Sequence, residues 1–187
     1  MLIVLGGLLG SGRRVLAQKL ALKYGLYHYN IDSKKLRDPS LGFDGEGNFR
    51  ILQPKTDEDQ LRVYEQVLED FPLLSKMHAN AIVDDSFHRE TPREYFLSGA
   101  RKYYKEVIFV WVESDDAGVA ERLEYMQKSK MIRSVAEAMQ RRRSAIETLQ
   151  LPASSVLRFF FSTSGKKQVA AVWELIQGRM HSKEIKT

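Results

Sequence analysis

The chain has 187 residues, of which 43% are hydrophobic and 28% are charged, a balance typical of a globular protein with one packed core. It contains no cysteine, which excludes a disulfide framework, a thiolate metal site and a catalytic thiol. The formal net charge of +5 suits an anionic partner such as a nucleotide or a polynucleotide, although a solvated basic surface gives the same charge.

The first nine residues are apolar, but this segment does not have the organisation of a secretory signal. Its positive charges, at Arg13 and Arg14, follow the apolar run, whereas a signal peptide places them before it. No segment reaches the roughly 18–20 consecutive apolar residues of a membrane span. We therefore expect a soluble, cytoplasmic protein that has no membrane partner.

Strand and helix patterns alternate from the first residues onward. Leu2–Leu5 is a short apolar run before two glycines and predicts a buried parallel strand. Residues 13–24 predict a helix that ends at Gly25, and residues 27–31 predict a second strand.

The middle of the chain contains an irregular segment and a long helical pattern. Glycines and prolines over 39–56 predict an exposed excursion. Residues 57–77 have helical periodicity, and Pro72 is expected to kink or divide this helix. Residues 81–83 predict a strand, and Thr91 is expected to be the N-cap of the next helix.

The rest of the chain continues the alternation. The predicted elements are a strand at 107–112, helices at 115–126 and 135–149, a strand at 156–161 and a helix at 167–180. Near-continuous apolar strands separated by helices indicate an α/β fold, in which a parallel sheet is covered on both faces. Such sheets bind ligands beyond the carboxyl ends of their strands, so functional residues are expected there.

The loop after the first strand, GLLGSGRR over 7–14, has the spacing of a phosphate-binding loop. Gly7 and Gly12 occupy the two glycine positions of G-x-x-x-x-G-K-[ST], and Gly10 and Ser11 match the inner spacing of small kinases. Between a strand and a helix, such a loop turns backbone N–H groups toward phosphate oxygens, and the helix dipole adds to the attraction. The alternative is a glycine turn that only packs the helix against the strand.

The last two positions of this motif differ from the consensus. Arg13 stands where a lysine reaches the β- and γ-phosphates, and Arg14 stands where a Ser or Thr hydroxyl holds Mg²⁺. Arginine keeps the positive charge on a bulkier, planar head. A guanidinium has no acceptor, so Arg14 cannot ligate a metal. The loop therefore predicts phosphate binding and puts the magnesium site in question.

With these motifs, the chain from Leu2 to about Ile176 resembles the small-molecule, nucleotide and polynucleotide kinase branch of the P-loop fold, which includes gluconate-kinase-like and zeta-toxin-like proteins. The resemblance implies a P-loop NTPase fold, a three-layer sandwich with a five-stranded parallel sheet and a helical lid. It implies one domain over 1–187, with a substrate-side insertion at about 38–78 and a lid at about 122–145.

The same resemblance implies the ligands. ATP, or another NTP, is the expected cofactor, together with the Mg²⁺ that Arg14 puts in question. The expected partners are this nucleotide and an acceptor, which is either a small molecule or a nucleic acid.

The end of the second strand resembles the family pattern D-x-D-x-x-R. Asp32 and Arg37 match it, whereas Lys34 replaces the second acid, which is the expected general base in polynucleotide-kinase-like members. The resemblance then implies that Asp32 and Arg37 bind the acceptor, and that Asp32 takes the catalytic role. The alternative for Asp32 is a helix N-cap.

The third strand runs into two adjacent carboxylates. Asp84 matches the family position whose carboxylate holds Mg²⁺ or accepts the proton of the substrate hydroxyl. Because Asp84 and Asp85 are adjacent they point in different directions, so one of them is expected to cap the following turn. Arg89 and Arg93 resemble the arginine-bearing segment that binds the acceptor, and His88 is expected to be structural.

The fourth strand leads into Glu121-Arg122-Leu123, which resembles the family's E-R-[LI] lid helix. Arg122 is therefore implied as a catalytic residue that neutralises charge on the transferred phosphoryl group. Met126 stands where the family frequently repeats an arginine. The triplet 141–143 keeps the region basic, with a solvated helix face as the alternative.

Three functions remain open at this level. The first is an ATP-dependent kinase for a small hydroxylated metabolite, a nucleoside or nucleotide, or a polynucleotide 5′ end. The second is a nucleotide-binding protein whose catalysis is impaired, and the third is a nucleic-acid-binding protein on a P-loop scaffold. Fold alone does not decide among them.

Overall fold

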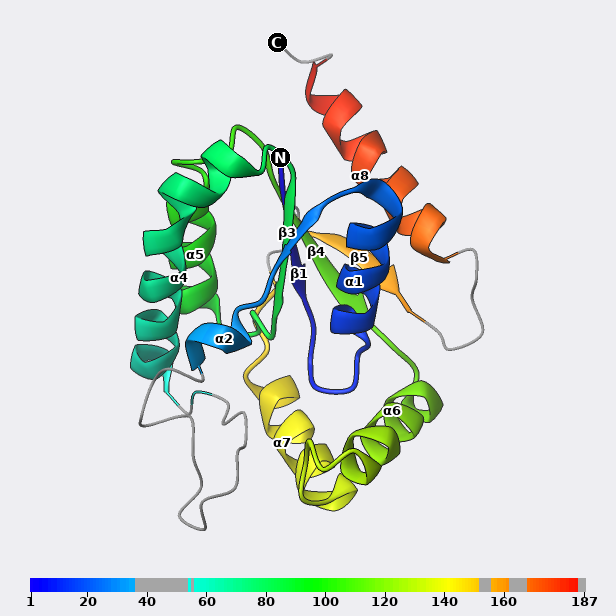
Figure 1. Cartoon of the computed structure of the whole chain (residues 1–187). Helices are drawn as coiled ribbons and strands as arrows, with labels where there is room; N and C mark the ends of the chain where they lie inside the picture. The colour runs from blue at the N-terminus through cyan, green and yellow to red at the C-terminus, as the bar shows by residue number, and fades with distance from the viewer. Residues whose placement is uncertain (36–53, 55, 152–155, 162–167, 185–187) are drawn as a thin grey trace.

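The structure is a computed structural model, and it describes residues 1–35, 54, 56–151, 156–161 and 168–184 (Figure 1). Its centre is a five-stranded sheet in the order β2-β3-β1-β4-β5, and every neighbouring pair of strands is parallel. The strands are β1 (Leu2–Gly6), β2 (Tyr27–Tyr29), β3 (Ala81–Asp85), β4 (Val107–Glu113) and β5 (Leu157–Phe160). The five-stranded parallel sheet predicted from the sequence is confirmed.

Helices cover both faces of this sheet. They are α1 (Arg13–Tyr24), α2 (Asp32–Lys35), α4 (Asp57–Met77), α5 (Glu90–Ala100), α6 (Asp116–Lys128), α7 (Val135–Glu147) and α8 (Gln168–Glu184). Figure 1 shows α4 and α5 on one side of the sheet and α1 and α8 on the other, which makes the three layers of an α/β sandwich.

The alternation of side chains along the central strands produces two separate cores. Leu2 and Val4 of β1 point to one face, where they pack with apolar residues of α4 and α5. Ile3 and Leu5 point to the other face, where they pack with residues of α1 and α8. Both sets are fully buried, which is why β1 reads as a continuous apolar run instead of an alternating one.

Two local predictions differ from the structure. Of the kink or division expected at Pro72, the division is wrong, because α4 continues from Asp57 to Met77. The proline ring lies on the exposed side, while Phe71 and Leu74 on the inner side pack into the core, so burial on both sides of Pro72 holds the helix together. In addition, α5 begins at Glu90, and its N-cap is Arg89 instead of Thr91.

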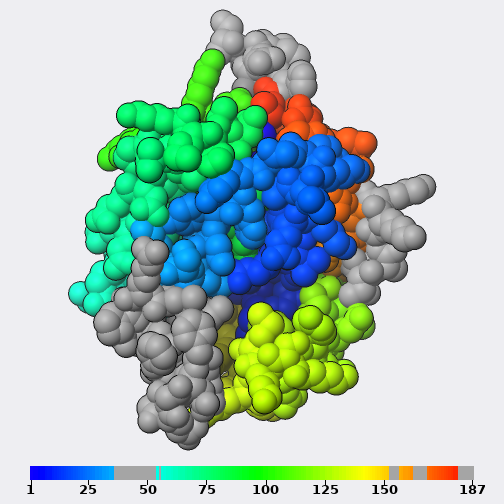
Figure 2. Space-filling model, in the orientation of Figure 1, coloured from blue at the N-terminus to red at the C-terminus, as the bar shows by residue number. Residues whose placement is uncertain are grey.

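The loops that follow β1, β3 and β4 emerge at one edge of the sheet, as the parallel topology requires. The helix pair α6–α7 lies beyond this edge. Figure 2 shows the atoms of this pair directly against those of the first loop. Leu9 from that loop packs with Val119, Leu123 and Ala138 of the pair, so a small third core joins the two. None of the described helices is long and apolar enough to cross a membrane.

Candidate functional site

The glycine loop, residues 7–14, leaves β1 and enters α1 through two residues in left-handed conformation. Gly10 has φ 80° and Gly12 has φ 85°, a region that side chains other than glycine rarely adopt. A Cβ at Gly12 would also lie 2.6 Å from the ring of Phe161. Ser11 is buried, and its amide donates to the carbonyl of Leu8 at 3.0 Å. Glycines therefore stand at the two loop positions whose backbone conformation disfavours any other residue.

The first turn of α1 has no capping side chain. The N-cap residues Thr56, Asp115 and Ser134 each accept a hydrogen bond from the first turn of α4, α6 and α7. The N-cap of α1 is Gly12, which has no side chain to do so, and this first turn contains no acidic residue. Among the described residues, the amides of Gly10 and Gly12 donate to no acceptor. Unpaired donors at the positive end of a helix dipole form a site for an anion.

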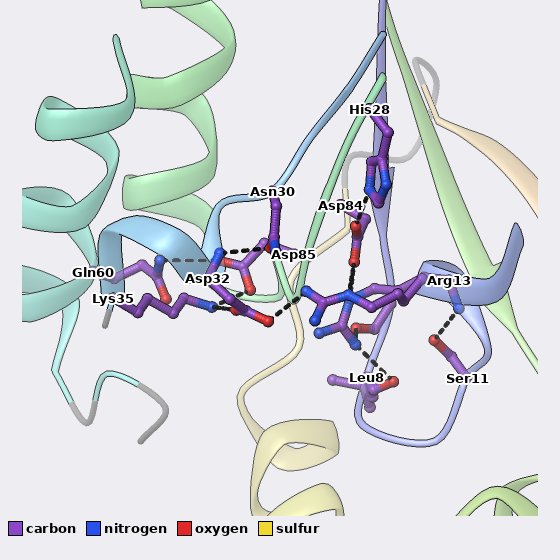
Figure 3. Close-up of polar contacts among 12 residues, drawn as sticks. Leu8, Ser11, Arg13, His28, Asn30, Asp32, Lys35, Gln60, Asp84 and Asp85 are labelled. Carbon is purple, nitrogen blue, oxygen red and sulfur yellow. Dashed lines mark hydrogen bonds and ion pairs between the residues drawn. The ribbon is translucent and has the colours of Figure 1, made fainter. Parts of the chain in front are cut away.

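Arg13 folds back over the loop that precedes it. Its Nη1 donates to the carbonyl of Gly7 at 2.7 Å and to that of Leu8 at 3.2 Å (Figure 3). Its Nε lies 3.9 Å from Asp84 Oδ2, and its Nη2 donates to no residue that the structure describes. Arg13 thus fixes the course of the loop and keeps free donors for a ligand oxygen.

Two arginines from the α6–α7 pair hold the next two carbonyls of the loop. Arg142 Nη1 donates to Leu9 O at 2.9 Å, and Arg122 Nε donates to Gly10 O at 2.6 Å. Arg122 Nη2 also donates to the hydroxyl of Ser114 at the end of β4. Burial lowers the pKa of both Arg122 and Arg142. Four successive carbonyls, from Gly7 to Gly10, therefore accept from guanidinium groups.

Arg14 joins the ends of two other strands. Its Nη2 lies 2.5 Å from Asp32 Oδ2, just after β2, and its Nε lies 3.3 Å from Asp84 Oδ2, near the end of β3. Burial lowers the pKa of Arg14, but the charges of Asp84 and Asp32 outweigh that effect and raise it above the ordinary value. Arg14 therefore remains a cation between two carboxylates.

Asp84 is held on one side by His28, as Figure 3 shows. His28 Nε2 donates to Asp84 Oδ1 at 2.7 Å. Burial raises the pKa of Asp84, but the hydrogen bond from His28 and the charges of Arg14 and Arg13 lower it below its ordinary value. Asp84 is thus an ionised carboxylate with both oxygens in use.

Asp85 points to the opposite face, into a buried polar cluster beneath α2 and α4. Lys35 Nζ lies 2.6 Å from Asp85 Oδ1, and Gln60 and Tyr64 each donate to Oδ2 at 3.3 Å. Lys35 Nζ also lies 3.3 Å from Asp32 Oδ1, so Asp32 is shared between Lys35 and Arg14 (Figure 3). The two adjacent carboxylates of β3 therefore serve different sides of the sheet.

Two of the arginines expected to bind the acceptor, Arg89 and Arg93, follow β3 in the chain and lie at the start of α5. Arg93 is fully buried, and its Nη1 donates to the carbonyls of Phe87 and Gln150 at 3.2 and 2.5 Å. Arg89 is more exposed and lies 3.5 Å from Asp57. Arg89 also lines a small hollow with Gln60 and Ser86. Arg37, the remaining residue of this set, lies outside the described residues.

Residues 86–88 make the turn between β3 and this arginine segment. Phe87 has φ 46°, an uncommon conformation for a bulky residue, and it is buried against Tyr64. Burial, with the nearby charge of Arg89, lowers the pKa of His88 from 6.5 to about 4. His88 Nδ1 is buried and has no hydrogen-bond partner among the described residues.

Sequence reasoning missed three participants: His28, Lys35 and Arg142. Lys35 lies in a lysine-rich turn that reads as exposed, yet its side chain has no exposed area. His28 lies in the second strand, one of many polar residues there. Arg142 is the middle of three consecutive arginines. Helical periodicity predicts that the three cannot all face the loop, but it does not identify which one does.

Comparisons place this geometry on a known fold. No protein-family model matches the chain, and no curated protein matches it. A sugar kinase from a Janibacter species has a TM-score of 0.66 and 18% identity, with 94% of each chain covered. A gluconokinase from Sinorhizobium meliloti has a TM-score of 0.63 and 20% identity, covering 96% of this chain and 95% of that one.

Kti12 from Chaetomium thermophilum, solved in complex with ADP-AlF3, has a TM-score of 0.59 and 12% identity, covering 95% of this chain and 98% of that one. The chain has the fold of the P-loop kinases. The P-loop NTPase sandwich that the glycine loop predicted is confirmed. Identities this low establish the fold, so function has to be argued from the site.

Proposed function

We propose that this protein is a small-metabolite kinase, which binds ATP or another nucleoside triphosphate at the glycine loop and transfers its terminal phosphoryl group to a hydroxyl. The observation that supports this most directly is the uncapped N-terminus of α1 behind a loop with unpaired amides. Nη2 of Arg13, which donates to no residue that the structure describes, is available to the same ligand. A phosphate chain satisfies all of these donors at once.

The acceptor lies, in this proposal, between α2 and the start of α5. Asp32 is the carboxylate next to this space, and its side chain keeps 9% exposure where that of Asp84 has none. Arg89 lies near the start of α5 on this acceptor side, while Arg93 positions the turn at Phe87 through its carbonyl. Sugars and sugar acids are the acceptor class that the sugar kinase and the gluconokinase suggest.

The transfer step uses these residues as follows. The acceptor oxygen forms a bond to the terminal phosphorus, while the bond from that phosphorus to the bridging oxygen breaks and its electron pair leaves with the nucleoside diphosphate. The hydroxyl proton passes to Asp32. Arg13 and Arg122 stabilise the negative charge of the transition state, which is the main demand of phosphoryl transfer.

Magnesium, which this fold implies, does not fit the residues present. Arg14 lies between the two carboxylates that would face the metal, and neither of them has an oxygen without a donor or a cation. Within the described parts of the chain, no group of three or more His, Cys, Asp or Glu side chains could hold a metal ion. The step above is therefore derived without a metal.

The same ion pairs favour a second candidate, which is nucleotide binding without transfer. Arg14 lies against one oxygen of Asp32 and Lys35 lies against the other, so both oxygens of this carboxylate already have a cation as partner. If transfer fails, ATP binding at the glycine loop is expected to remain.

ATP titration by calorimetry, followed by an assay for ADP over a panel of sugars, sugar acids, nucleosides and polynucleotide 5′ ends, tests the proposal. Gly12→Val should weaken ATP binding by at least about tenfold, because a side chain there meets the ring of Phe161 and disfavours the left-handed backbone of the loop, whereas Gly178→Ala on α8 should not. ATP binding without ADP formation on any acceptor would leave only the second candidate. No ATP binding, beside salt-sensitive binding of RNA or DNA, would contradict both.

A further inference from the structure

We propose that the guanidinium of Arg14 takes the place of the divalent cation in this site, so that the nucleotide phosphates are bound without a metal ion. The inference rests on the proposed nucleotide binding at the glycine loop and specifies its cation. Four observations support it: the position of Arg14, the occupation of two carboxylates, the charge of the site and the donors that Arg14 keeps free.

The position of Arg14 is the first argument. Arg14 follows the glycine loop directly, in the first turn of α1. From there its guanidinium lies 2.5 Å from Asp32, just after β2, and 3.3 Å from Asp84, near the end of β3. One cation therefore bridges carboxylates from two neighbouring strands. A metal held between the loop and these strand ends would occupy the same space.

The occupation of the carboxylates is the second argument. Asp84 Oδ1 accepts from His28, and Oδ2 faces Arg14 and Arg13. Asp32 Oδ1 faces Lys35, and Oδ2 faces Arg14. Mg²⁺ binds carboxylate oxygens at about 2.0–2.1 Å in strict octahedral geometry. Mg²⁺ could reach Oδ2 of Asp32 or of Asp84 only if the guanidinium of Arg14 moved away. The positive charge of Arg14 would then remain close to the metal ion.

The charge of the site is the third argument. Asp32 and Asp84 are both buried and both contact Arg14, and a buried carboxylate needs a compensating cation. Arg14 supplies that charge at all times, because a guanidinium does not lose its proton in proteins. A metal is therefore not required to balance the site before the nucleotide arrives.

The free donors of Arg14 are the fourth argument, and they distinguish this role from a purely structural tie. Its side chain is 31% exposed, and its Nη1 donates to no residue that the structure describes. Nη2 of Arg13 is free in the same sense. Two guanidinium groups at the start of α1 can therefore bind phosphate oxygens, with Arg14 held in place by the carboxylates.

The test compares the wild-type chain with Arg14→Thr, which restores a hydroxyl and exposes both carboxylates. Lys19→Thr, a loss of an exposed cation on the same helix, is the matched control. The first readout is binding of Mn²⁺ to the protein alone, followed by the electron paramagnetic resonance of the free ion. We expect no binding by the wild type or Lys19→Thr, and binding by Arg14→Thr.

The second readout is the affinity for ATP in Mg²⁺ and in EDTA. The wild type and Lys19→Thr should differ less than about threefold between the two conditions, whereas Arg14→Thr should lose at least about tenfold in EDTA. Arg14→Lys keeps a cation and should resemble the wild type, which keeps the comparison informative if Arg14→Thr does not fold.

Loss of wild-type ATP binding in EDTA, or Mn²⁺ binding by the wild type with an affinity equal to that of Arg14→Thr, would overturn the inference. A failure of the proposed function gives a different result. In that case no variant binds ATP in either condition, while the Mn²⁺ measurement still decides whether Arg14 excludes the metal.

Discussion

Asp84 and Asp85 are adjacent at the end of β3 but have different surroundings. We expect Asp84 to affect the glycine-loop site and Asp85 to affect mainly the stability of the fold. Asp84 faces α1, where its partners Arg14 and His28 are partly exposed. Asp85 faces α2 and α4, where Lys35 and Tyr64 have no exposed area and Gln60 is almost fully buried. One carboxylate therefore lies beside the glycine loop, and the other lies in the interior.

This difference follows from the geometry of a strand, because successive side chains point to opposite faces. Removing a charge from the interior leaves its partner without water or a counter-ion, whereas a partner near the surface can turn to solvent. We therefore expect substitutions on the two faces to affect different measurements, and the following predictions test that separation.

The largest expected effect is on stability, from Asp85→Asn. This substitution leaves Lys35, whose side chain has no exposed area, with only the more distant Asp32 at 3.3 Å in place of Asp85 at 2.6 Å, and breaking such a buried pair costs about 3–5 kcal/mol. Asp84→Asn should reduce the free energy of unfolding by less, because Arg14 keeps Asp32 and reaches solvent. Urea denaturation of both variants measures the difference. Equal losses would show that the two faces are not distinct.

A smaller effect is expected from pH. His88 has a pKa of about 4 in the folded protein and about 6.5 when unfolded, so the unfolded chain binds more protons between these values. Stability is then complete above pH 6.5 and falls as the pH drops toward 4, by roughly 1–2 kcal/mol for a partly buried ring.

His88→Gln should remove this slope, as followed by thermal unfolding across the same pH range. Asp84 and Asp85, whose pKa values are already lowered from 3.8, act at lower pH and should keep their contribution in the variant. A slope that survives in His88→Gln would assign it to other groups.

The smallest expected effect concerns the contact between the α6–α7 pair and the glycine loop. Arg142→Gln removes the hydrogen bond to Leu9 O, which should make amide exchange over 8–14 faster by roughly threefold to tenfold. Arg143→Gln is the matched control, because Arg143 is exposed on the same helix. Equal exchange in the two variants would mean that Arg142 does not hold the loop.

Much of the fold was predictable, because it is determined by local patterns. The apolar strands and the helices between them indicated a parallel sheet covered on both faces, and the glycines of the loop indicated the first strand-to-helix turn. The continuity of α4 through Pro72 was not predictable from the same patterns, since packing of Phe71 and Leu74 decides it.

The polar partners of the site were less predictable, because they depend on which strands are neighbours. His28 pairs in register with Ile82, two residues before Asp84, and this places its ring within hydrogen-bond distance of that carboxylate. Arg14 meets Asp32 and Asp84 only because β2 lies beside β3 and β3 beside β1. The motif showed that Arg14 cannot ligate a metal, but it could not show what the arginine binds instead.

The most direct test of the account is a crystal structure of the wild-type chain grown with ADP and Mn²⁺, with the metal located by its anomalous scattering. We expect the β-phosphate on the amides of the glycine loop, Arg14 between Asp32, Asp84 and a phosphate oxygen, and no Mn²⁺ on either carboxylate. Mn²⁺ bound to Asp84, with Arg14 turned out to solvent, would contradict the central claim.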